Sequence, residues 1–358
     1  MVGIQDVPVG SMVAKPIYDS KLSLLVNMGT PLSEKLLLKL QNVDIRHLYI
    51  EDEVSKGIVL EPLIPEVLKL QSVVIMKKIY DAQLHELHRE SIRESTIKEL
   101  KELVDDVISE IYSKSGEKYY STELLGVEMY HYDHSVEVMI LSLLIGKQMG
   151  LDRERLLKLG MGAILADVGK ARVPDAIINK KGKLTPEEFE EMKYHVQHSY
   201  NILKDLVALS SLSRQIVMLH HEKLDGSGYP NGFSGDEIPV LVRIVTACDI
   251  FCAIVSDRTY NSRISVDTAL EILRSASPMK LDADVVHTLA QVVDVYPPGT
   301  LIQLSSGAVC IVVETNTSSA TRPKVRMIQA PGSYQIGDVV DLMKDLTLFV
   351  KKVLPKLP

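Results

Sequence analysis

The longest uninterrupted feature of the sequence is a stretch of 50 residues, from Glu66 to Ser115, that contains neither proline nor glycine. Apolar residues recur in it every three or four positions, as at Leu100, Val104 and Val107, which is the spacing of one helical face. A single helix of this length would extend about 75 Å, and two helices with a break near residues 88–95 fit the pattern equally well. Such helices either pack on their own domain or serve in signalling or dimerisation.

The remaining patterns divide the chain into further parts. Residues 1–62 resemble a small α+β module, with short strands broken at glycine and proline and a helix whose N-cap is Ser33. Residues 63–118 form a helical linker or dimerisation region, and residues 119–298 contain mainly helical patterns joined by short polar loops. Residues 299–358 alternate like strands. The expected fold class is therefore mainly α, with a small N-terminal α+β module and a short β-rich C-terminal tail.

Composition and charge narrow the class of protein. A chain of 358 residues with a hydrophobic fraction of 46 % can bury the cores of two or three domains. Its net charge of −7 disfavours a nucleic-acid polymer as partner, because neutralising phosphates needs a basic face. No run approaches the roughly 18 apolar residues of a membrane span. Without a signal-peptide pattern or a cysteine framework, we expect a reducing, cytoplasmic setting.

Histidines and aspartates supply the first indication of chemistry. Six of the ten histidines lie between His131 and His221, and metal ligands must converge in this way. The candidates lie in or beside predicted helices: His134, Asp167, His195, His220, His221 and Asp249. Imidazoles and carboxylates suit divalent Fe, Mn, Zn or Ni. A carboxylate such as Asp167 can bridge two ions about 3.5–4 Å apart, an arrangement that supports hydrolytic phosphoryl transfer. Each residue taken alone is more often structural.

Six separated motifs together resemble the HD-GYP domain, a branch of the HD superfamily that hydrolyses cyclic di-GMP. They are HSVEV (134–138), ADVGKARVP (166–174), GKLTPEEFEEMKYH (182–195), HHEKLDGSGYPNG (220–232), GDEIP (235–239) and CDIFCAIVSDRTY (248–260). Their order and spacing match the family over residues 120–300, so the resemblance implies a helical HD-type domain there. The N-terminal module and the β-rich tail also look like segments that accompany such domains.

The resemblance implies a ligand set for two metals. One ion would be held by His134, Asp167, Asp249 and the residue at position 166, and the other by Asp167, His195, His220 and His221. The implied cofactor is one or two divalent transition metal ions, with Fe or Mn favoured and Zn or Ni as alternatives.

Further residues are implied in catalysis and substrate binding. Asp167 and Lys170 would be catalytic, with Lys170 as a phosphate contact and a candidate acid. Gly228, Tyr229 and Pro230 would lie in a loop beside the substrate. Arg258 would contact a phosphate or a base, for which its planar guanidinium is suited.

The sequence departs from the family pattern at four positions. Ala166 replaces the histidine of the HD pair, and a methyl group cannot coordinate a metal. Tyr130 stands where some members hold a third ion with a carboxylate, and Cys252 stands where a second aspartate is common. Asn261 stands where a basic residue often follows the tyrosine of the last motif. Ala166 alone would also fit an engineered inactivating change, but Tyr130, Cys252 and Asn261 are harder to explain in that way and together favour a naturally divergent domain.

Two other histidines are candidates to replace the missing imidazole. His131 lies one helical turn before His134, and His198 lies one turn after His195, so each shares a helical face with an expected ligand. A solvated surface position is the commoner role for such residues.

Three functions fit these observations. The first, which we expect, is a metal-dependent phosphodiesterase for cyclic di-GMP or a related cyclic dinucleotide, slow or impaired by the loss of one ligand. The second is a catalytically inactive nucleotide receptor or interaction module, with a homodimer through residues 66–115 or a signalling protein as partner. The third is a purely structural helical domain. The choice between the enzyme and the receptor depends on whether the metal site works with Ala166 in place of a histidine.

Overall fold

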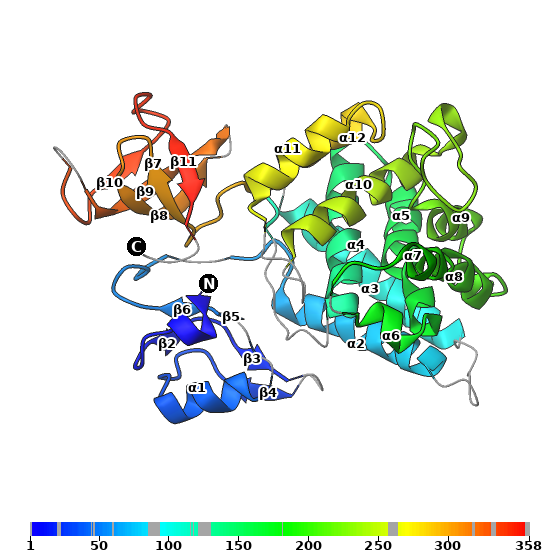
Figure 1. The fold of residues 1–358 in the computed structure, drawn as a ribbon, viewed down its shortest axis with the longest axis horizontal. Helices are drawn as coiled ribbons and strands as arrows, with labels where there is room; N and C mark the ends of the chain where they lie inside the picture. The colour runs from blue at the N-terminus through cyan, green and yellow to red at the C-terminus, as the bar shows by residue number, and fades with distance from the viewer. Residues whose placement is uncertain are drawn as a thin grey trace. The chain divides into compact units, whose positions relative to one another are not determined.

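The computed structural model divides the chain into two compact units (Figure 1). It describes residues 2–19, 23–43, 45, 47–58, 61–84, 94–114, 116, 118–120, 130–180, 182–256, 264–316, 319–330 and 334–354. The first unit contains residues 1–62, 116–130 and 293–358, and the second contains residues 63–115 and 131–292. Among the described helices, none is both long enough and apolar enough to cross a membrane.

The N-terminal part of the first unit is a small α+β module, as predicted. Its elements are β1 (Val2–Gly3), η1 (Ile4–Asp6), β2 (Met12–Val13), β3 (Ile17–Tyr18), β4 (Leu24–Val26), α1 (Glu34–Gln41), β5 (His47–Leu48) and β6 (Ile50–Glu51). The strands pair antiparallel as β1–β5, β2–β6 and β3–β4. Ser33 caps α1, because its hydroxyl accepts a hydrogen bond from the backbone N of Leu36 at 3.3 Å.

The C-terminal part of the first unit is a five-stranded antiparallel sheet, which confirms the predicted β-rich tail. Its strands are β7 (Leu301–Leu304), β8 (Val309–Asn316), β9 (Ser319–Gln329), β10 (Val339–Asp341) and β11 (Val350–Val353), in the order β10-β9-β8-β7-β11. Alternate residues of β9, such as Val325 and Met327, are buried, as the two-residue period of a strand requires.

The second unit is all-helical in its described residues, which confirms the predicted mainly-α class. Its elements are α2 (Glu66–Leu84), α3 (Glu94–Ser113), α4 (Tyr130–Gln148), α5 (Arg153–Leu165), η3 (Val168–Arg172), α6 (Asp175–Ile178), α7 (Pro186–Lys193), α8 (His195–Leu203), α9 (Ser211–Leu219), η4 (Gly235–Glu237), α10 (Val240–Val255), α11 (Val266–Ala276) and α12 (Ala283–Val292). Large side chains such as Met139 and Phe251 are fully buried, so α4 and α10 contribute to one core.

The stretch without proline or glycine forms two helices rather than one. Helices α2 and α3 pack against each other, and α3 also packs against α5 within the same unit. The expected apolar face of α3 is fully buried, with Leu100, Val104 and Val107 each 0 % exposed. The alternative of one continuous helix is therefore wrong. A dimer through this region stays a prediction.

Candidate metal centre

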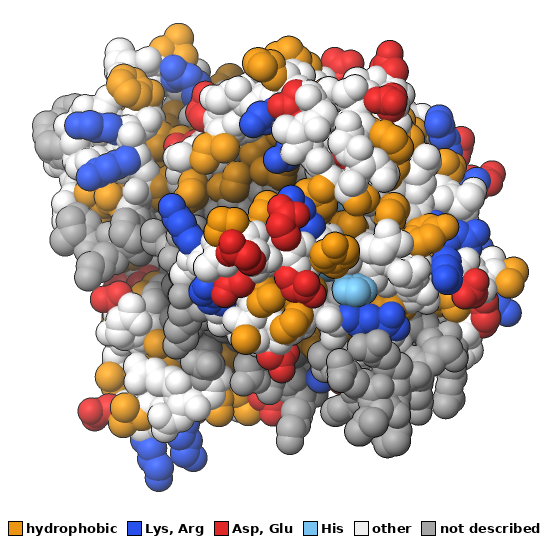
Figure 2. Space-filling view, turned by 45° about the vertical axis from the view of Figure 1, so that its right-hand side comes forward, with side chains coloured by type: hydrophobic (Ala, Val, Ile, Leu, Met, Phe, Trp, Pro, Cys, Tyr) orange, Lys and Arg blue, Asp and Glu red, His pale blue; other side chains and the backbone are white. Residues whose placement is uncertain are grey.

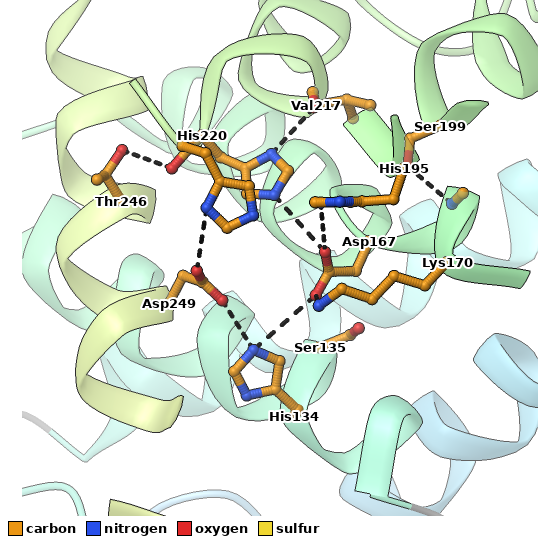
Figure 3. A network of polar contacts seen from close by, with 12 residues as sticks. His134, Ser135, Asp167, Lys170, His195, Ser199, Val217, His220, Thr246 and Asp249 are labelled. Atoms are coloured by element: carbon orange, nitrogen blue, oxygen red, sulfur yellow. Dashed lines mark hydrogen bonds and ion pairs between the residues drawn. The ribbon is translucent and has the colours of Figure 1, made fainter. Parts of the chain in front are cut away.

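The six expected metal ligands come together inside the helical unit (Figure 3). They are His134 on α4, Asp167 between α5 and η3, His195 at the start of α8, His220 and His221 directly after α9, and Asp249 on α10. The helices bring together residues that are distant in sequence: His134 and Asp249, 115 positions apart, approach to 2.8 Å between Nε2 and Oδ1. The ligand atoms form two groups that share Asp167.

The larger group consists of Asp167, His195, His220 and His221, with one ligand atom of each lying within 4.8 Å of all the others. Oδ1 of Asp167 is 3.2 Å from Nε2 of His195 and 3.6 Å from Nε2 of His220. These three atoms and Nε2 of His221 are buried, and none has a hydrogen-bond partner among the described residues. Buried polar atoms rarely stay unpaired. A divalent cation that accepts their lone pairs therefore fits this group.

The tautomers of two histidines fit the same interpretation. Nδ1 of His195 is 2.8 Å from the carbonyl oxygen of Met192, and Nδ1 of His220 is 3.0 Å from that of Val217. A carbonyl oxygen can only accept, so each Nδ1 carries the proton and donates it. Each Nε2 is left with a lone pair that points toward Asp167 (Figure 3). Metal-binding histidines are held in this way.

The smaller group consists of His134, Asp167 and Asp249. Nε2 of His134 is 4.0 Å from Oδ2 of Asp167, in addition to its contact with Asp249. Ala166 is the C-cap of α5 and is buried, and its methyl group offers no ligand atom. This group offers three ligand atoms where the larger one offers four.

Both carboxylates of the centre are held in the ionised form. Burial by itself raises the pKa of Asp167, but Lys170 and the imidazoles outweigh it and hold that pKa well below its usual range. Nζ of Lys170 lies 2.6 Å from Oδ2 of Asp167. Burial likewise raises the pKa of Asp249, and the contact with His134 reverses the effect, so the net pKa is lowered. Ionised carboxylates are the form that binds metals.

Burial acts in the opposite direction on the histidines. It lowers the pKa of His195 in spite of the nearby Asp167. Burial, with His220 alongside, lowers the pKa of His221 well below its usual value. Both imidazoles are therefore neutral at pH 7, and a neutral imidazole is the ligand form.

The expected substrate loop lies directly against the histidine pair. The rings of Tyr229 and His221 stack, with 4.7 Å between centroids and 28° between planes. The carboxylate of Glu222, which is 1 % exposed, accepts hydrogen bonds from the backbone N atoms of Asn231 and Phe233 at 2.7 and 3.2 Å. Glu222 therefore holds the loop that contains Tyr229 closed beside the centre.

Two residues beside this loop were not predicted from sequence. Phe189 on α7 is 47 % exposed, and its ring lies edge-on to Tyr229 with 6.4 Å between centroids. Nζ of Lys193 lies 5.1 Å from the centroid of Phe189 and 5.8 Å from that of Tyr229. Both residues lie within the recognised motif GKLTPEEFEEMKYH, so the sequence indicated this segment without indicating these two side chains.

The centre is supported by residues that the sequence did not single out. The hydroxyl of Thr246 donates to the carbonyl oxygen of His220 at 2.8 Å, and the hydroxyl of Ser199 accepts from the backbone N of Gly169 at 2.8 Å. A Cβ at Gly169 would lie 2.1 Å from the carbonyl oxygen of His195, so only glycine lets η3 pack this closely on α8. Tyr80 of α2 also contacts Asp167, and Lys69 of α2 contacts Asp133 and Glu137, which lie on either side of His134 in the sequence.

The remaining residues singled out in the sequence lie outside the two ligand groups or outside the described residues. Among the described residues, neither ligand group includes His131 or His198, the two candidates to replace the missing imidazole. Cys252 is buried on α10. Arg258, Asn261 and the side chain of Tyr130 lie outside what the structure describes.

Comparison with known proteins assigns the family. Residues 112–285 match the family model of the HD domain, and residues 301–356 match that of the KOW domain associated with HD domain. Residues 112–285 are therefore an HD domain, and the predicted resemblance to HD-GYP proteins is confirmed. An HDG"Y"P protein from Bdellovibrio bacteriovorus has a similar fold, with a TM-score of 0.52, 16 % identity and coverage of 80 % of this chain and 95 % of that one.

Curated relatives are similar over part of the chain. A cyclic di-GMP phosphodiesterase from Pseudomonas aeruginosa is 32 % identical over 228 residues, which cover 63 % of this chain and 54 % of the relative. A 3'3'-cGAMP-specific phosphodiesterase from Vibrio cholerae is 35 % identical and covers 46 % of this chain and 35 % of its own length. A cyclic di-GMP phosphodiesterase from Thermotoga maritima is 36 % identical, with 47 % of each chain covered. The chain thus spans about a third to just over half of these relatives.

Proposed function

We propose that this protein is a metal-dependent phosphodiesterase that hydrolyses a cyclic dinucleotide such as cyclic di-GMP. The supporting observation is the set of buried ligand atoms around Asp167 that have no hydrogen-bond partner among the described residues. The similar relatives named as cyclic di-GMP or cGAMP phosphodiesterases supply the substrate class. We propose Fe or Mn as the metal, with Zn or Ni as alternatives, because imidazole and carboxylate ligands suit all four.

In this proposal the residues of the chain bind and orient the substrate around the metals. Bound divalent ions would supply Lewis acidity, which activates a water and takes up negative charge from phosphate oxygens. Asp167 stays ionised and joins the two groups. Lys170, which lies 2.6 Å from Asp167, would contact a phosphate and hold a proton for the leaving oxygen.

The substrate would lie along the loop of Gly228, Tyr229 and Pro230, which closes one side of the centre. Phe189 and Lys193 extend this side with an exposed ring and a cation, a combination suited to the flat face and the charge of a nucleotide. Arg258 remains a proposed phosphate or base contact. On the face drawn in Figure 2, acidic and basic side chains are interspersed rather than gathered in one basic region, which suits a small anion better than a nucleic-acid polymer.

The test combines metal analysis with an assay. Protein purified without chelator would be analysed for metal content, and cyclic di-GMP would then be supplied with Mn or, anaerobically, with Fe. We expect one or two ions per chain and formation of the linear dinucleotide. Absence of any linear product with every metal, in protein that does bind metal, would overturn the catalytic proposal.

A second candidate function is a nucleotide receptor without turnover, and Ala166 is the observation that favours it. A group with three protein ligands would hold its ion less firmly, so binding could persist where hydrolysis does not. Calorimetry would then detect binding of cyclic di-GMP without product. A homodimer through residues 66–115 or a protein partner would appear as an increased mass in light scattering.

We also propose a reducing, cytoplasmic setting. Cys248, Cys252 and Cys310 are buried and form no disulfide, and burial raises the pKa of the Cys248 thiol to about 12. Such thiols stay protonated and unreactive. Fractionation of cells that produce the protein would test the compartment.

A further inference from the structure

Helix α2 contacts the elements that carry the metal ligands through two buried side chains. The first is Lys69, which is 4 % exposed. Its Nζ lies 3.1 Å from Oδ1 of Asp133 and also contacts the carboxylate of Glu137. Both acidic residues are on α4, and they flank His134 in sequence: Asp133 precedes it directly and Glu137 follows almost one turn later. The ammonium therefore contacts acidic side chains on both sides of His134 and restrains the helical turn that carries its imidazole.

The second contact is made by Tyr80, near the other end of α2. Its side chain is 3 % exposed, and its hydroxyl donates to the backbone carbonyl oxygen of Asp167 at 2.7 Å. The ring packs edge-on against Tyr132 of α4, with 5.1 Å between centroids. Gln83, one turn later on α2, accepts a hydrogen bond from Arg172 of η3 at 2.7 Å. This end of α2 therefore contacts the peptide group that precedes η3 and the side chain of the last residue of η3.

The two contacts constrain different parts of the centre. Lys69 restrains the rotation of α4 and hence the direction of His134. Tyr80 restrains the peptide group of Asp167, whose carboxylate belongs to both ligand groups. Neither side chain is one of the six ligand residues. Metal affinity depends strongly on such outer contacts, because they set the orientation of the ligands.

We propose that Lys69 and Tyr80 are positioning residues, through which α2 sets the metal affinity of the centre. Tyr80 acts on both ligand groups through Asp167, and Lys69 acts on the smaller group through His134. This inference rests on the proposed binding of metal by the six residues. It assigns α2 a part in the centre that neither the family motifs nor the spacing of the sequence indicates.

The first test compares two variants that each remove one hydroxyl from the interface of α2 and α4. Chelator-treated wild type, Tyr80→Phe and Tyr132→Phe would be titrated with Mn²⁺, with affinity and stoichiometry followed by electron paramagnetic resonance. We expect Tyr80→Phe to weaken Mn²⁺ binding by about 10-fold or more. Tyr132→Phe, the matched control, should bind like wild type because no contact joins its hydroxyl to a ligand residue.

A readout of stability separates positioning from a merely structural role. The melting temperature of each protein would be measured with and without Mn²⁺. A structural role lowers both values equally and leaves the increase caused by Mn²⁺ unchanged, whereas a positioning role makes that increase smaller. A Tyr80→Phe protein with wild-type affinity and a wild-type increase would overturn the proposal. Wild type that binds no Mn²⁺ would instead contradict the proposed metal centre.

Lys69 needs a compensated variant, because removing the ammonium alone leaves two buried carboxylates unpaired and can prevent folding. The double variant Lys69→Met/Glu137→Gln removes one charge of each sign. We expect it to lose the weaker Mn²⁺ site and to keep the tighter one. Lys77→Met is the control, because Lys77 lies on the same helix and pairs with Asp81 of α2 at 2.8 Å. Retention of both sites by the double variant would contradict the role of Lys69.

Discussion

Nε2 of His134 and Oδ1 of Asp249 are hydrogen-bonded to each other at 2.8 Å, although both are expected ligands of the same ion. A cation that enters the smaller group must replace this bond. In the larger group, Oδ1 of Asp167 and Nε2 of each of the three histidines have no such bond among the described residues. We therefore expect the larger group to fill first and to bind more tightly, since buried lone pairs there gain a partner without losing one.

Restoring the missing imidazole should strengthen the smaller group. Ala166→His adds a fourth ligand beside His134, Asp167 and Asp249, so we expect metal content to rise from about one ion toward two per chain. Turnover of cyclic di-GMP should rise by about 10-fold or more, since even outer contacts of a metal change activity by about 10–100-fold. Elemental analysis and product chromatography measure the two effects.

The control for this variant is Ala176→His, which places the same side chain at an exposed position on α6. It should leave metal content and rate unchanged. If Ala166→His also leaves both metal content and rate unchanged, the loss of the imidazole does not limit the centre. The limiting change would then be one of the other departures from the family pattern, at Tyr130, Cys252 or Asn261.

Removing the shared carboxylate should disable the whole centre. Asp167→Asn keeps the shape of the side chain but removes the charge that both groups use, so we expect loss of bound metal and a decrease in turnover of at least ~100-fold. Asp236→Asn is the matched control, because Asp236 is exposed and pairs with Arg243, away from the centre. Metal content of the Asp167→Asn protein equal to wild type would contradict the proposed ligand set.

Four of the six expected ligands, His195, His221, Asp167 and Asp249, should release almost no protons when metal binds near neutral pH. The pKa values of His195 and His221 are lowered, as are those of Asp167 and Asp249, so these four ligands are already deprotonated at pH 7. Calorimetric titration with Mn²⁺ in two buffers of different ionisation enthalpy should give the same enthalpy. The affinity should stay level from pH 8 to 6.5 and fall only at lower pH, where the imidazoles take up protons. Release of about one proton per ion at pH 7 would show that a ligand is protonated beforehand.

Asp294 should make the first unit less stable as pH rises. It is 5 % exposed, and burial raises its pKa to about 6, against about 3.9 in an unfolded chain. Between these values the folded state holds a proton that the unfolded state has lost, so stability decreases as pH rises and the cost is complete above pH 6. We expect Asp294→Asn to stabilise this unit by about 1–3 kcal/mol at pH 7.5 and by little at pH 4. Denaturation at both pH values measures this, and an equal effect at both would refute it.

The residues of the candidate centre could be predicted because chemistry and spacing mark them in the sequence. An aspartate before Val-Gly-Lys, or a histidine pair before a glycine-rich turn, carries its own local signal. Lys69 and Tyr80 carry none, because the pattern of residues 66–115 predicts a helix there but does not indicate which residues each side chain contacts. Their partners, Asp133 and the carbonyl of Asp167, are set by tertiary packing.

The break in the long helical stretch was equally hard to place. Proline and glycine usually mark where a helix ends, and residues 66–115 contain neither. The pattern fixed the buried face of α3, but it left one helix and two helices equally acceptable. Packing of α2 against α3 decides between them, and that information is not local.

Gly228 does more than form a turn: it lets the loop pack closely against the backbone of the histidine pair. A Cβ there would lie 2.4 Å from the Cα of Glu222 and 2.6 Å from the carbonyl oxygen of His221, the same oxygen that accepts from the backbone N of Tyr229 at 3.3 Å. Any side chain at position 228 would push on the backbone of a ligand. The two segments therefore constrain each other: a substitution that moves the backbone of one also moves the backbone of the other.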